Sequence, residues 1–372
     1  MAIRLSNFFQ RKRREFESFQ IEVSTYCSLE CPTCPKRVFA EQWIFQKMSL
    51  ETFQKISPLF SLTRWISFHG WGDPLENENI IPMLRLAKRA NCLASLTTPG
   101  ILLTEELSQQ FIDEGLDRIV VYLNAVGRPA RGNEHLDPDF RNILMGVERM
   151  VGLKKRLNRK YPIVTLSLPV TRMNINRLSD VIPLGSKLRV NELEFTHLNY
   201  LPTASSNILR TFYHVSPNPA FEKSMEEIKQ LGKKMGIPVR TSPLKAEEKI
   251  ICEANPPKSV FFSVDGSVAP CDYLRIPKKG DIPRVFLNKE YLVPQTFFGN
   301  INQDDFQGIL RKEPYQRLRK TFEDRGKTQV GMAQLWDAFS AAKSSNGLAK
   351  TNGGSPPPLP DVCQTCYKAY GV

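Results

Sequence analysis

Three closely spaced cysteines near the start of the chain are the residues best able to do chemistry. Cys27, Cys31 and Cys34 have the spacing C-x3-C-x2-C and follow an alternating apolar stretch that ends at Val23. Thiolate is the usual ligand of iron–sulfur clusters, so three thiolates on one loop can hold three corners of a cubane cluster. The fourth iron then lacks a protein ligand and can bind a small molecule. A structural zinc site would normally be closed by four ligands.

A glycine-rich turn, Gly70-Trp71-Gly72-Asp73-Pro74, follows a predicted strand over residues 65–68. The glycines permit a sharp turn with exposed backbone carbonyls. The cysteine triplet and this turn resemble the radical S-adenosylmethionine (radical SAM) superfamily, whose triplet binds the catalytic [4Fe-4S] cluster. The family has Gly-Gly-Glu-Pro at the turn, which holds the amino group of S-adenosylmethionine. Aligned on Pro74, Trp71 and Asp73 replace the first glycine and the glutamate, and the aspartate keeps the negative charge.

Four further cysteines, Cys252, Cys271, Cys363 and Cys366, lie in the C-terminal third. Residues 260–268 between the first two predict a β-hairpin with an Asp-Gly turn, and the last two are spaced C-x2-C. Two such local pairs can close a complete four-thiolate site. From the spacing alone, a structural zinc site stays open. The pattern C-x13-G-x4-C resembles the SPASM and twitch extensions of radical SAM enzymes, which implies one auxiliary [4Fe-4S] cluster.

Strand and helix patterns alternate up to about residue 200. Strands are predicted over residues 19–23, 65–68, 93–97, 118–123, 163–170 and 192–198, with helices over 50–60, 79–90, 104–114, 140–157 and 178–184. This alternation implies an α/β fold with a parallel sheet and right-handed crossovers. Six such units predict a partial (β/α)6 TIM-like barrel, and the family resemblance implies the same fold.

The chain is expected to fall into four segments. These are a basic N-terminal lead-in over residues 1–18, the partial barrel over 19–215, a bridging helix and strand over 216–248, and a small cysteine-rich SPASM/twitch domain over 249–372. Ala, Ser, Gly, Asn and Pro are frequent over residues 340–360. We therefore predict a mobile insertion over residues 327–360.

Loops that follow the barrel strands are expected to hold the reactive groups, because active sites of such barrels lie at the C-terminal ends of the strands. By resemblance these loops would bind S-adenosylmethionine, with candidate contacts at Thr33, Gly70, Gly72, Asp73, Thr97, Asn124 and Arg172. Ordinary strand-end capping explains Thr97, Asn124 and Arg172 equally well.

Asp272 directly follows Cys271. Sulfatase-maturating relatives have a base at the corresponding place, so Asp272 is the candidate catalytic proton acceptor. The alternative is a turn residue whose carboxylate accepts backbone hydrogen bonds.

Composition excludes several classes of protein. The chain has 372 residues, of which 41% are hydrophobic, so it can build a core and is not globally disordered. No apolar run is long enough to cross a bilayer, and the N-terminus lacks the apolar segment of a secretory signal. We therefore expect a cytoplasmic protein, in which clustered cysteines are better explained as metal ligands than as disulfide partners.

The net charge of +13 fits either a solvated basic surface or an anionic substrate. The basic clusters do not interleave with aromatic residues in the manner of a single-stranded nucleic-acid binder. Nucleic acid is therefore not an expected partner.

The resemblance implies reductive cleavage of S-adenosylmethionine to a 5′-deoxyadenosyl radical, which takes a hydrogen atom from a substrate carbon. An auxiliary cluster would then favour net oxidation or crosslinking of a small molecule or peptide, with flavodoxin or ferredoxin as an electron donor. Epimerisation stays open, with Cys92 as a hydrogen-donating thiol, because the other cysteines belong to the two sets. An alternative of a different class is a basic binding module stabilised by zinc in both sets.

Overall fold

The computed structural model describes residues 14–123, 138–341 and 355–372, with the backbone alone over 328–341. Within these ranges ten strands form one sheet in the order β12-β9-β8-β1-β2-β3-β4-β5-β6-β7, and β10 pairs with β11 in a second sheet. The strands are β1 (Phe16–Ile21), β2 (Thr63–Phe68), β3 (Leu93–Thr98), β4 (Arg118–Tyr122), β5 (Ile163–Val170), β6 (Glu192–His197), β7 (Val239–Thr241), β8 (Ser259–Phe262), β9 (Ser267–Ala269), β10 (Ile282–Phe286), β11 (Lys289–Val293) and β12 (Gly299–Asn300).

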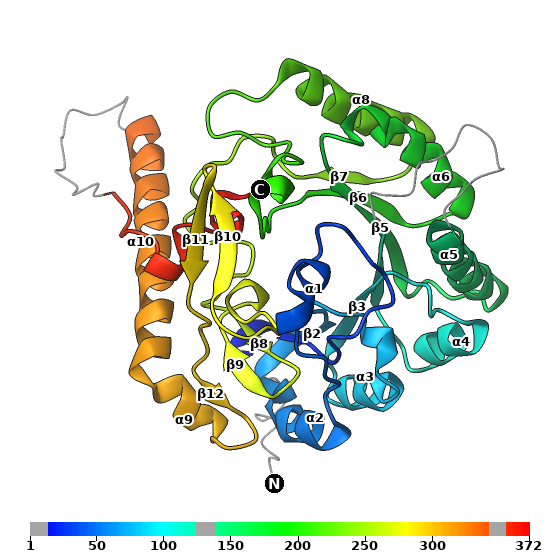
Figure 1. Ribbon diagram of the computed structural model, residues 1–372, viewed down its shortest axis with the longest axis horizontal. Coiled ribbons are helices and arrows are strands. Elements are labelled where there is room, and N and C mark those ends of the chain that lie inside the picture. The colour runs from blue at the N-terminus through cyan, green and yellow to red at the C-terminus, as the bar shows by residue number, and fades with distance from the viewer. Residues whose placement is uncertain (1–13, 124–137, 342–354) are drawn as a thin grey trace, which may run out of the picture.

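Helices cover the outer face of the parallel strands (Figure 1). Two of the predicted helix boundaries have a clear local cause. Ser49 Oγ accepts a hydrogen bond from the Thr52 N–H at 3.1 Å where α2 begins, and Gly236 ends α8 with a left-handed φ of 68°. The helices are α1 (Pro35–Val38), α2 (Leu50–Ile56), α3 (Ile80–Arg89), α4 (Glu105–Asp113), α5 (Pro138–Arg156), α6 (Val181–Leu188), α7 (Ala204–Asn207), α8 (Pro219–Met235), α9 (Phe306–Arg311) and α10 (Glu313–Ala341).

The predicted α/β barrel is confirmed. All six predicted strands are present, and β1 to β6 pair in parallel in chain order. The sheet ends at β7 on one side and at β12 on the other, so the barrel is open. The main core lies between the sheet and its helices; for example, Phe53 of α2 stacks on Phe68 of β2 with ring centroids 6.0 Å apart.

Residues 216–248 differ from the predicted bridge between two domains. Met225 and Ile228 of α8 are buried in the main core, and α8 packs against α6. The following strand β7 pairs in parallel with β6, where Leu193 lies opposite Val239. The segment therefore adds a seventh helix–strand unit to the barrel sheet, because the apolar side of α8 finds its partner there.

The C-terminal part is joined to the barrel through the same sheet. Strand β8 pairs in parallel with β1, with Phe19 opposite Val260. Phe306 of α9 covers this junction, with ring centroids 6.1 Å from Phe19 and 5.9 Å from Phe262. Aromatic packing across the junction makes the barrel and the C-terminal elements share one core.

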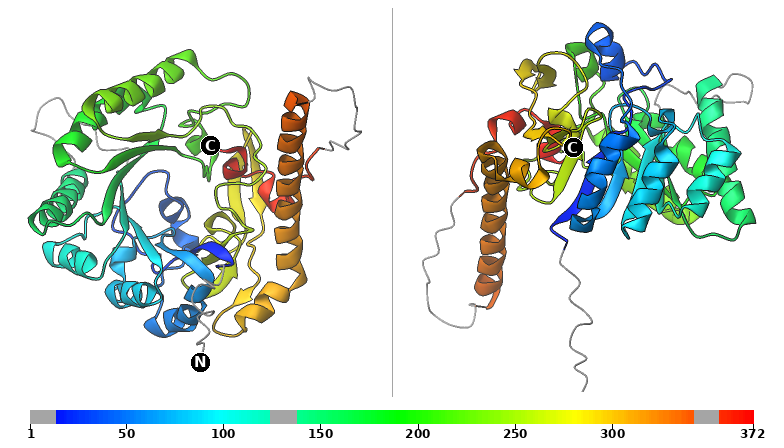
Figure 2. Two further views of the ribbon diagram at one scale, coloured as in Figure 1. Left: turned by 180° about the vertical axis from the view of Figure 1, so that it is seen from behind. Right: turned by 90° about the horizontal axis from the view of Figure 1, so that it is seen from below.

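Helix α10 occupies part of the predicted mobile insertion over residues 327–360. The helix continues to Ala341, so residues 327–341 are helical. It runs along the outer side of the C-terminal elements (Figure 2). Residues 342–354 of the predicted insertion lie outside the described residues.

Candidate active site

The cysteine triplet lies on the loop that follows β1, at the C-terminal edge of the parallel strands. The Cys34 N–H donates to the Cys31 carbonyl at 3.0 Å, which tightens the loop between these residues. Lys36 Nζ donates to the Cys27 carbonyl at 2.8 Å and so connects the first cysteine to helix α1, which begins after the third. These contacts hold the backbone of the loop that carries the three cysteines.

The thiols are poor acids in the bare protein. Burial raises the pKa of Cys27 and Cys31 to about 12 and also raises the pKa of Cys34. A bound metal centre reverses this situation, because it deprotonates the thiols that coordinate it. The triplet therefore fits a metal cluster better than it fits a free nucleophilic cysteine, which needs a lowered pKa.

The glycine turn packs directly on the cysteine loop. The Asp73 N–H donates to the Tyr26 carbonyl at 2.7 Å, immediately before Cys27. A Cβ at Gly72 would lie 2.5 Å from the Ser24 carbonyl oxygen, so the turn approaches the backbone of the cysteine loop too closely for any side chain.

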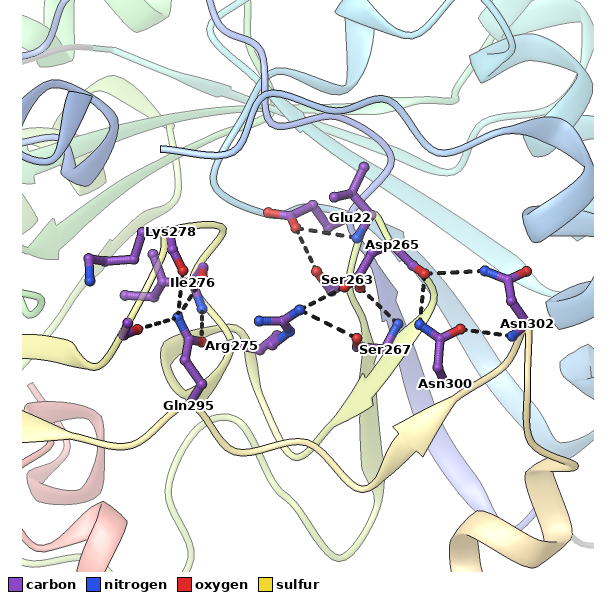
Figure 3. Close-up of polar contacts among 12 residues, drawn as sticks. Glu22, Ser263, Asp265, Ser267, Arg275, Ile276, Lys278, Gln295, Asn300 and Asn302 are labelled. Atoms are coloured by element: carbon purple, nitrogen blue, oxygen red, sulfur yellow. Dashed lines mark hydrogen bonds and ion pairs between the residues drawn. The ribbon is translucent and has the colours of Figure 1, made fainter. Parts of the chain in front are cut away.

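Glu22 occupies the space beside Gly70 and was missed by the sequence reasoning. A Cβ at Gly70 would lie 2.5 Å from Glu22 Cγ. One Glu22 oxygen accepts from the Trp71 N–H at 2.8 Å. The other accepts from Ser263 Oγ at 3.2 Å and from the Val264 N–H at 3.4 Å (Figure 3). Burial raises the pKa of Glu22 to about 7. This carboxyl therefore connects the glycine turn to the C-terminal hairpin.

The Asp73 side chain is fully buried and only partly satisfied. Its Oδ1 accepts from the Leu75 N–H at 3.0 Å and from Thr98 Oγ1 at 2.8 Å. Its Oδ2 has no partner. Burial raises the pKa of Asp73 to about 6. An orphaned buried carboxylate oxygen beside the Cys27 loop fits a cationic ligand group, which would supply the missing partner.

Thr33 and Thr97 are both half-buried, the first in the cysteine loop and the second in β3. The hydroxyl bonded to Asp73 belongs to Thr98 rather than to the predicted Thr97. The same Thr98 hydroxyl accepts from the Gly100 N–H at 2.9 Å. Strand residues alternate between faces, so a shift of one residue decides which threonine supports the carboxylate.

Two predicted contacts lie apart from this arrangement. The Arg172 guanidinium is on an exposed residue and donates to the Arg210 carbonyl at 2.9 Å and to the Tyr213 hydroxyl at 3.2 Å. These contacts join two loops within the barrel. Asn124 lies outside the described residues.

The second cysteine set lines a single small cavity. The residues around it come from the hairpin, α10 and the chain end, and they are Cys252, Ala254, Pro256, Pro270, Cys271, Leu274, Leu318, Val362, Cys363, Cys366, Lys368 and Ala369. Burial raises the pKa of Cys252 to about 11, and burial also raises the pKa of Cys271 and Cys363. Four thiols around one apolar cavity fit a fully ligated iron–sulfur cluster.

Hydrogen bonds and an ion pair at Asp265 hold the turn between β8 and β9. Gly266 has a left-handed φ of 84°, as the predicted Asp-Gly turn requires. The Asp265 carbonyl accepts from Asn300 Nδ2 at 2.9 Å and from Asn302 Nδ2 at 3.2 Å, and the Asp265 carboxylate pairs with Arg275 at 2.6 Å (Figure 3). These contacts fix the hairpin that leads to Cys271.

Asp272 is a buried ion-pair partner. Its Oδ1 accepts from Lys368 Nζ at 3.1 Å, and the two side chains are 5% and 17% exposed. Burial alone would raise the pKa of Asp272, but the charge of Lys368 and the nearby His69 hold it below its usual value. The carboxylate is therefore ionised at neutral pH. Lys368 was missed by the sequence reasoning, although it lies two residues after Cys366.

Trp71 connects the glycine turn to Asp272. Its indole N–H donates to the Asp272 carbonyl at 2.9 Å. Its ring packs against Tyr200 and Tyr273, with ring centroids at 5.2 and 5.3 Å. The tryptophan that replaces a glycine of the family turn thus contacts both the barrel and the C-terminal part.

Cys92 and the cysteine triplet lie at opposite edges of the parallel sheet. It precedes β3, at the N-terminal edge of the parallel strands, and its Sγ contacts the Phe60 carbonyl oxygen at 3.3 Å. The triplet lies at the opposite edge. Cys92 is therefore not positioned as a hydrogen donor to a substrate bound beside the triplet.

Within the described residues, no three His, Cys, Asp or Glu side chains converge on one point as a single metal ion requires. In a cubane each thiolate binds a different iron, so its ligands need not converge.

In the same described part of the chain, no helix has the length and apolar character needed to span a membrane.

Residues 252–367 match the SPASM family, described as an iron–sulfur cluster-binding domain. The chain is also similar to proteins of known name. The chain is 22% identical over 310 residues to the tungsten-containing aldehyde ferredoxin oxidoreductase cofactor-modifying protein of Pyrococcus furiosus, covering 80% of this chain and 82% of that protein. It is 25% identical over 198 residues to the PqqA peptide cyclase of Gluconobacter oxydans, covering 49% of each.

The fold resembles that of Streptococcus suis SuiB in its crystal structure bound to S-adenosylmethionine. The TM-score is 0.58 with 13% identity, over 82% of this chain and 68% of SuiB. The fold of the chain is thus the radical SAM partial barrel followed by a SPASM domain.

Proposed function

We propose that this chain, which joins the radical SAM barrel to a SPASM domain, cleaves S-adenosylmethionine reductively and uses the 5′-deoxyadenosyl radical to oxidise a substrate. Cys27, Cys31 and Cys34 would hold the [4Fe-4S] cluster that binds S-adenosylmethionine. The four cysteines around the second cavity would hold an auxiliary [4Fe-4S] cluster.

The unpartnered oxygen of Asp73 is the observation that carries this proposal. A buried carboxylate without a partner costs free energy, and a cationic ligand group removes that cost. The amino group of S-adenosylmethionine is such a group. Asp73 lies beside the Cys27 loop, where the cofactor must also reach the open iron.

Two residues would act on the substrate side. When bound, the first cluster supplies the electron that cleaves S-adenosylmethionine, and the auxiliary cluster accepts one electron from the substrate. Asp272 is ionised by its pairing with Lys368 and would take the proton that leaves the substrate. Trp71 would hold Asp272 at the barrel edge through its bond to the Asp272 carbonyl.

The substrate class is a small molecule or a peptide, and it is anionic if the basic surface takes part in binding it. A small molecule is supported by the cofactor-modifying relative, and a peptide by the peptide cyclase relative. Flavodoxin or ferredoxin would supply the electron that starts each turnover. Net oxidation or crosslinking is favoured over epimerisation because Cys92 lies at the wrong edge of the sheet.

Iron analysis and turnover together test this proposal. Anaerobically reconstituted protein should hold about eight irons per chain, which corresponds to two cubanes. With dithionite and S-adenosylmethionine it should form 5′-deoxyadenosine, and the Cys31→Ala variant should form none. Stoichiometric zinc without iron, or product formation by Cys31→Ala, would overturn the proposal.

A further inference from the structure

Lys368 has a place in the structure that the proposed function does not use. Its side chain lines the cavity of the second cysteine set, and it is the one Lys, Arg, Asp or Glu among the described residues that line it. Its ammonium also pairs with Asp272 at 3.1 Å and lies 3.7 Å from the centroid of the Tyr273 ring. One cation therefore contacts both the cavity and the candidate proton acceptor.

The position of Lys368 matters because of the charges expected around the cavity. Four thiolates around a cluster would place several negative charges in an apolar space, where charges are weakly screened. Arg284 is also buried nearby and donates to the carbonyls of Val362 and Tyr273, but its side chain does not line the cavity. Among the residues that line the cavity, Lys368 thus supplies the positive charge. Asp272 pairs with it and does not line the cavity.

We propose that Lys368 raises the reduction potential of the auxiliary cluster and, through its bond to Asp272, positions the proton acceptor beside the electron acceptor. A positive charge near a cluster stabilises the reduced state, which carries one more negative charge. The Asp272 carboxylate opposes this effect. The inference rests on the proposed function, because it requires a cluster in the second site.

Opposite shifts of the potential distinguish this role from simple packing. Lys368→Met keeps most of the side-chain volume and removes the charge, so the potential should fall. Asp272→Asn removes the opposing charge, so the potential should rise. Lys368→Arg keeps the charge and should leave the potential close to the wild-type value. A structural role alone would not produce shifts of opposite sign.

The measurement is a redox titration followed by electron paramagnetic resonance. It is made in a background that carries Cys27→Ala, Cys31→Ala and Cys34→Ala, so that only the auxiliary cluster is present. The control is Lys245→Met, since Lys245 is half-exposed and pairs with Glu247 away from the cavity. If Lys368→Met binds too little iron to titrate, the potentials of Asp272→Asn and Lys368→Arg still test the inference.

The inference is overturned if the Lys368→Met potential equals that of the Lys245→Met control, or if Lys368→Met and Asp272→Asn shift it in the same direction. If Lys368→Met binds no cluster, the inference is overturned when Asp272→Asn does not raise the potential. Failure of the background protein to bind iron would overturn the auxiliary site itself. A loaded cluster with an unmoved potential would leave the proposed function standing and remove only the role of Lys368.

Discussion

Three buried carboxyl residues in or beside the glycine turn have different surroundings and therefore different expected roles. Glu22 accepts hydrogen bonds from the turn and from the hairpin. Asp73 has one oxygen without a partner, and Asp272 is paired with Lys368. Only the unpaired carboxylate offers a free binding site for a cationic group. Residue-scale predictions follow from this difference.

Asp73→Asn should weaken the binding of S-adenosylmethionine to the reconstituted protein by about 10- to 100-fold. The reason is that a charge-assisted hydrogen bond contributes about 1.5–3 kcal/mol. Equilibrium dialysis with labelled S-adenosylmethionine measures this effect, with Asp281→Asn on an exposed loop as the matched control. Equal affinities for Asp73→Asn and the control would show that Asp73 does not bind the amino group.

Glu22→Gln should change how stability depends on pH. Burial raises the pKa of Glu22 from 4.5 to about 7, so its contribution is fully present below pH 4.5 and is lost as the pH rises through 7. Relative to wild type, the variant should therefore gain about 3 kcal/mol in free energy of unfolding between these pH values. Denaturant unfolding of the metal-free protein at a series of pH values gives the comparison. Parallel pH profiles for the two proteins would contradict this assignment.

At the scale of elements, the glycine turn is the part that depends most on close backbone approach. Gly72→Ala places a Cβ 2.5 Å from a backbone oxygen of the cysteine loop, so the turn must move away from the triplet. Formation of 5′-deoxyadenosine should fall at least tenfold, as is typical when a binding group is displaced.

The matched control is Gly152→Ala in the interior of α5, where a Cβ meets no atom within 4 Å. That variant should keep its activity and gain about 0.5–1 kcal/mol of stability, because alanine favours a helix over glycine. Full activity of Gly72→Ala would mean that the turn does not need this contact.

The sequence predicts these elements well where the signal is local. Strand and helix periodicity located the barrel units, and cysteine spacing pointed to the two candidate cluster-binding sets. Long-range pairing is not visible in a single sequence, so the addition of β8 beside β1 and of β7 beside β6 was missed. Burial partners are hidden for the same reason, which explains why Glu22 and Lys368 were overlooked.

At the scale of the whole molecule, the sheet places the hairpin that leads to Cys271 beside the strand that leads to the first cysteine set. The first set follows β1, and Cys271 follows the hairpin of β8 and β9, where β8 is the neighbour of β1. Trp71 and Glu22 cross from the barrel to the C-terminal part at this place.

The most direct test of this account asks whether the first cluster has an open iron. The measurement is the electron paramagnetic resonance spectrum of the reduced Cys363→Ala/Cys366→Ala variant, in which the first cluster is the one expected to remain, with and without S-adenosylmethionine. The account predicts that the cofactor changes the cluster signal. An unchanged signal at saturating S-adenosylmethionine would contradict it, because the fourth iron would then not be available to the cofactor.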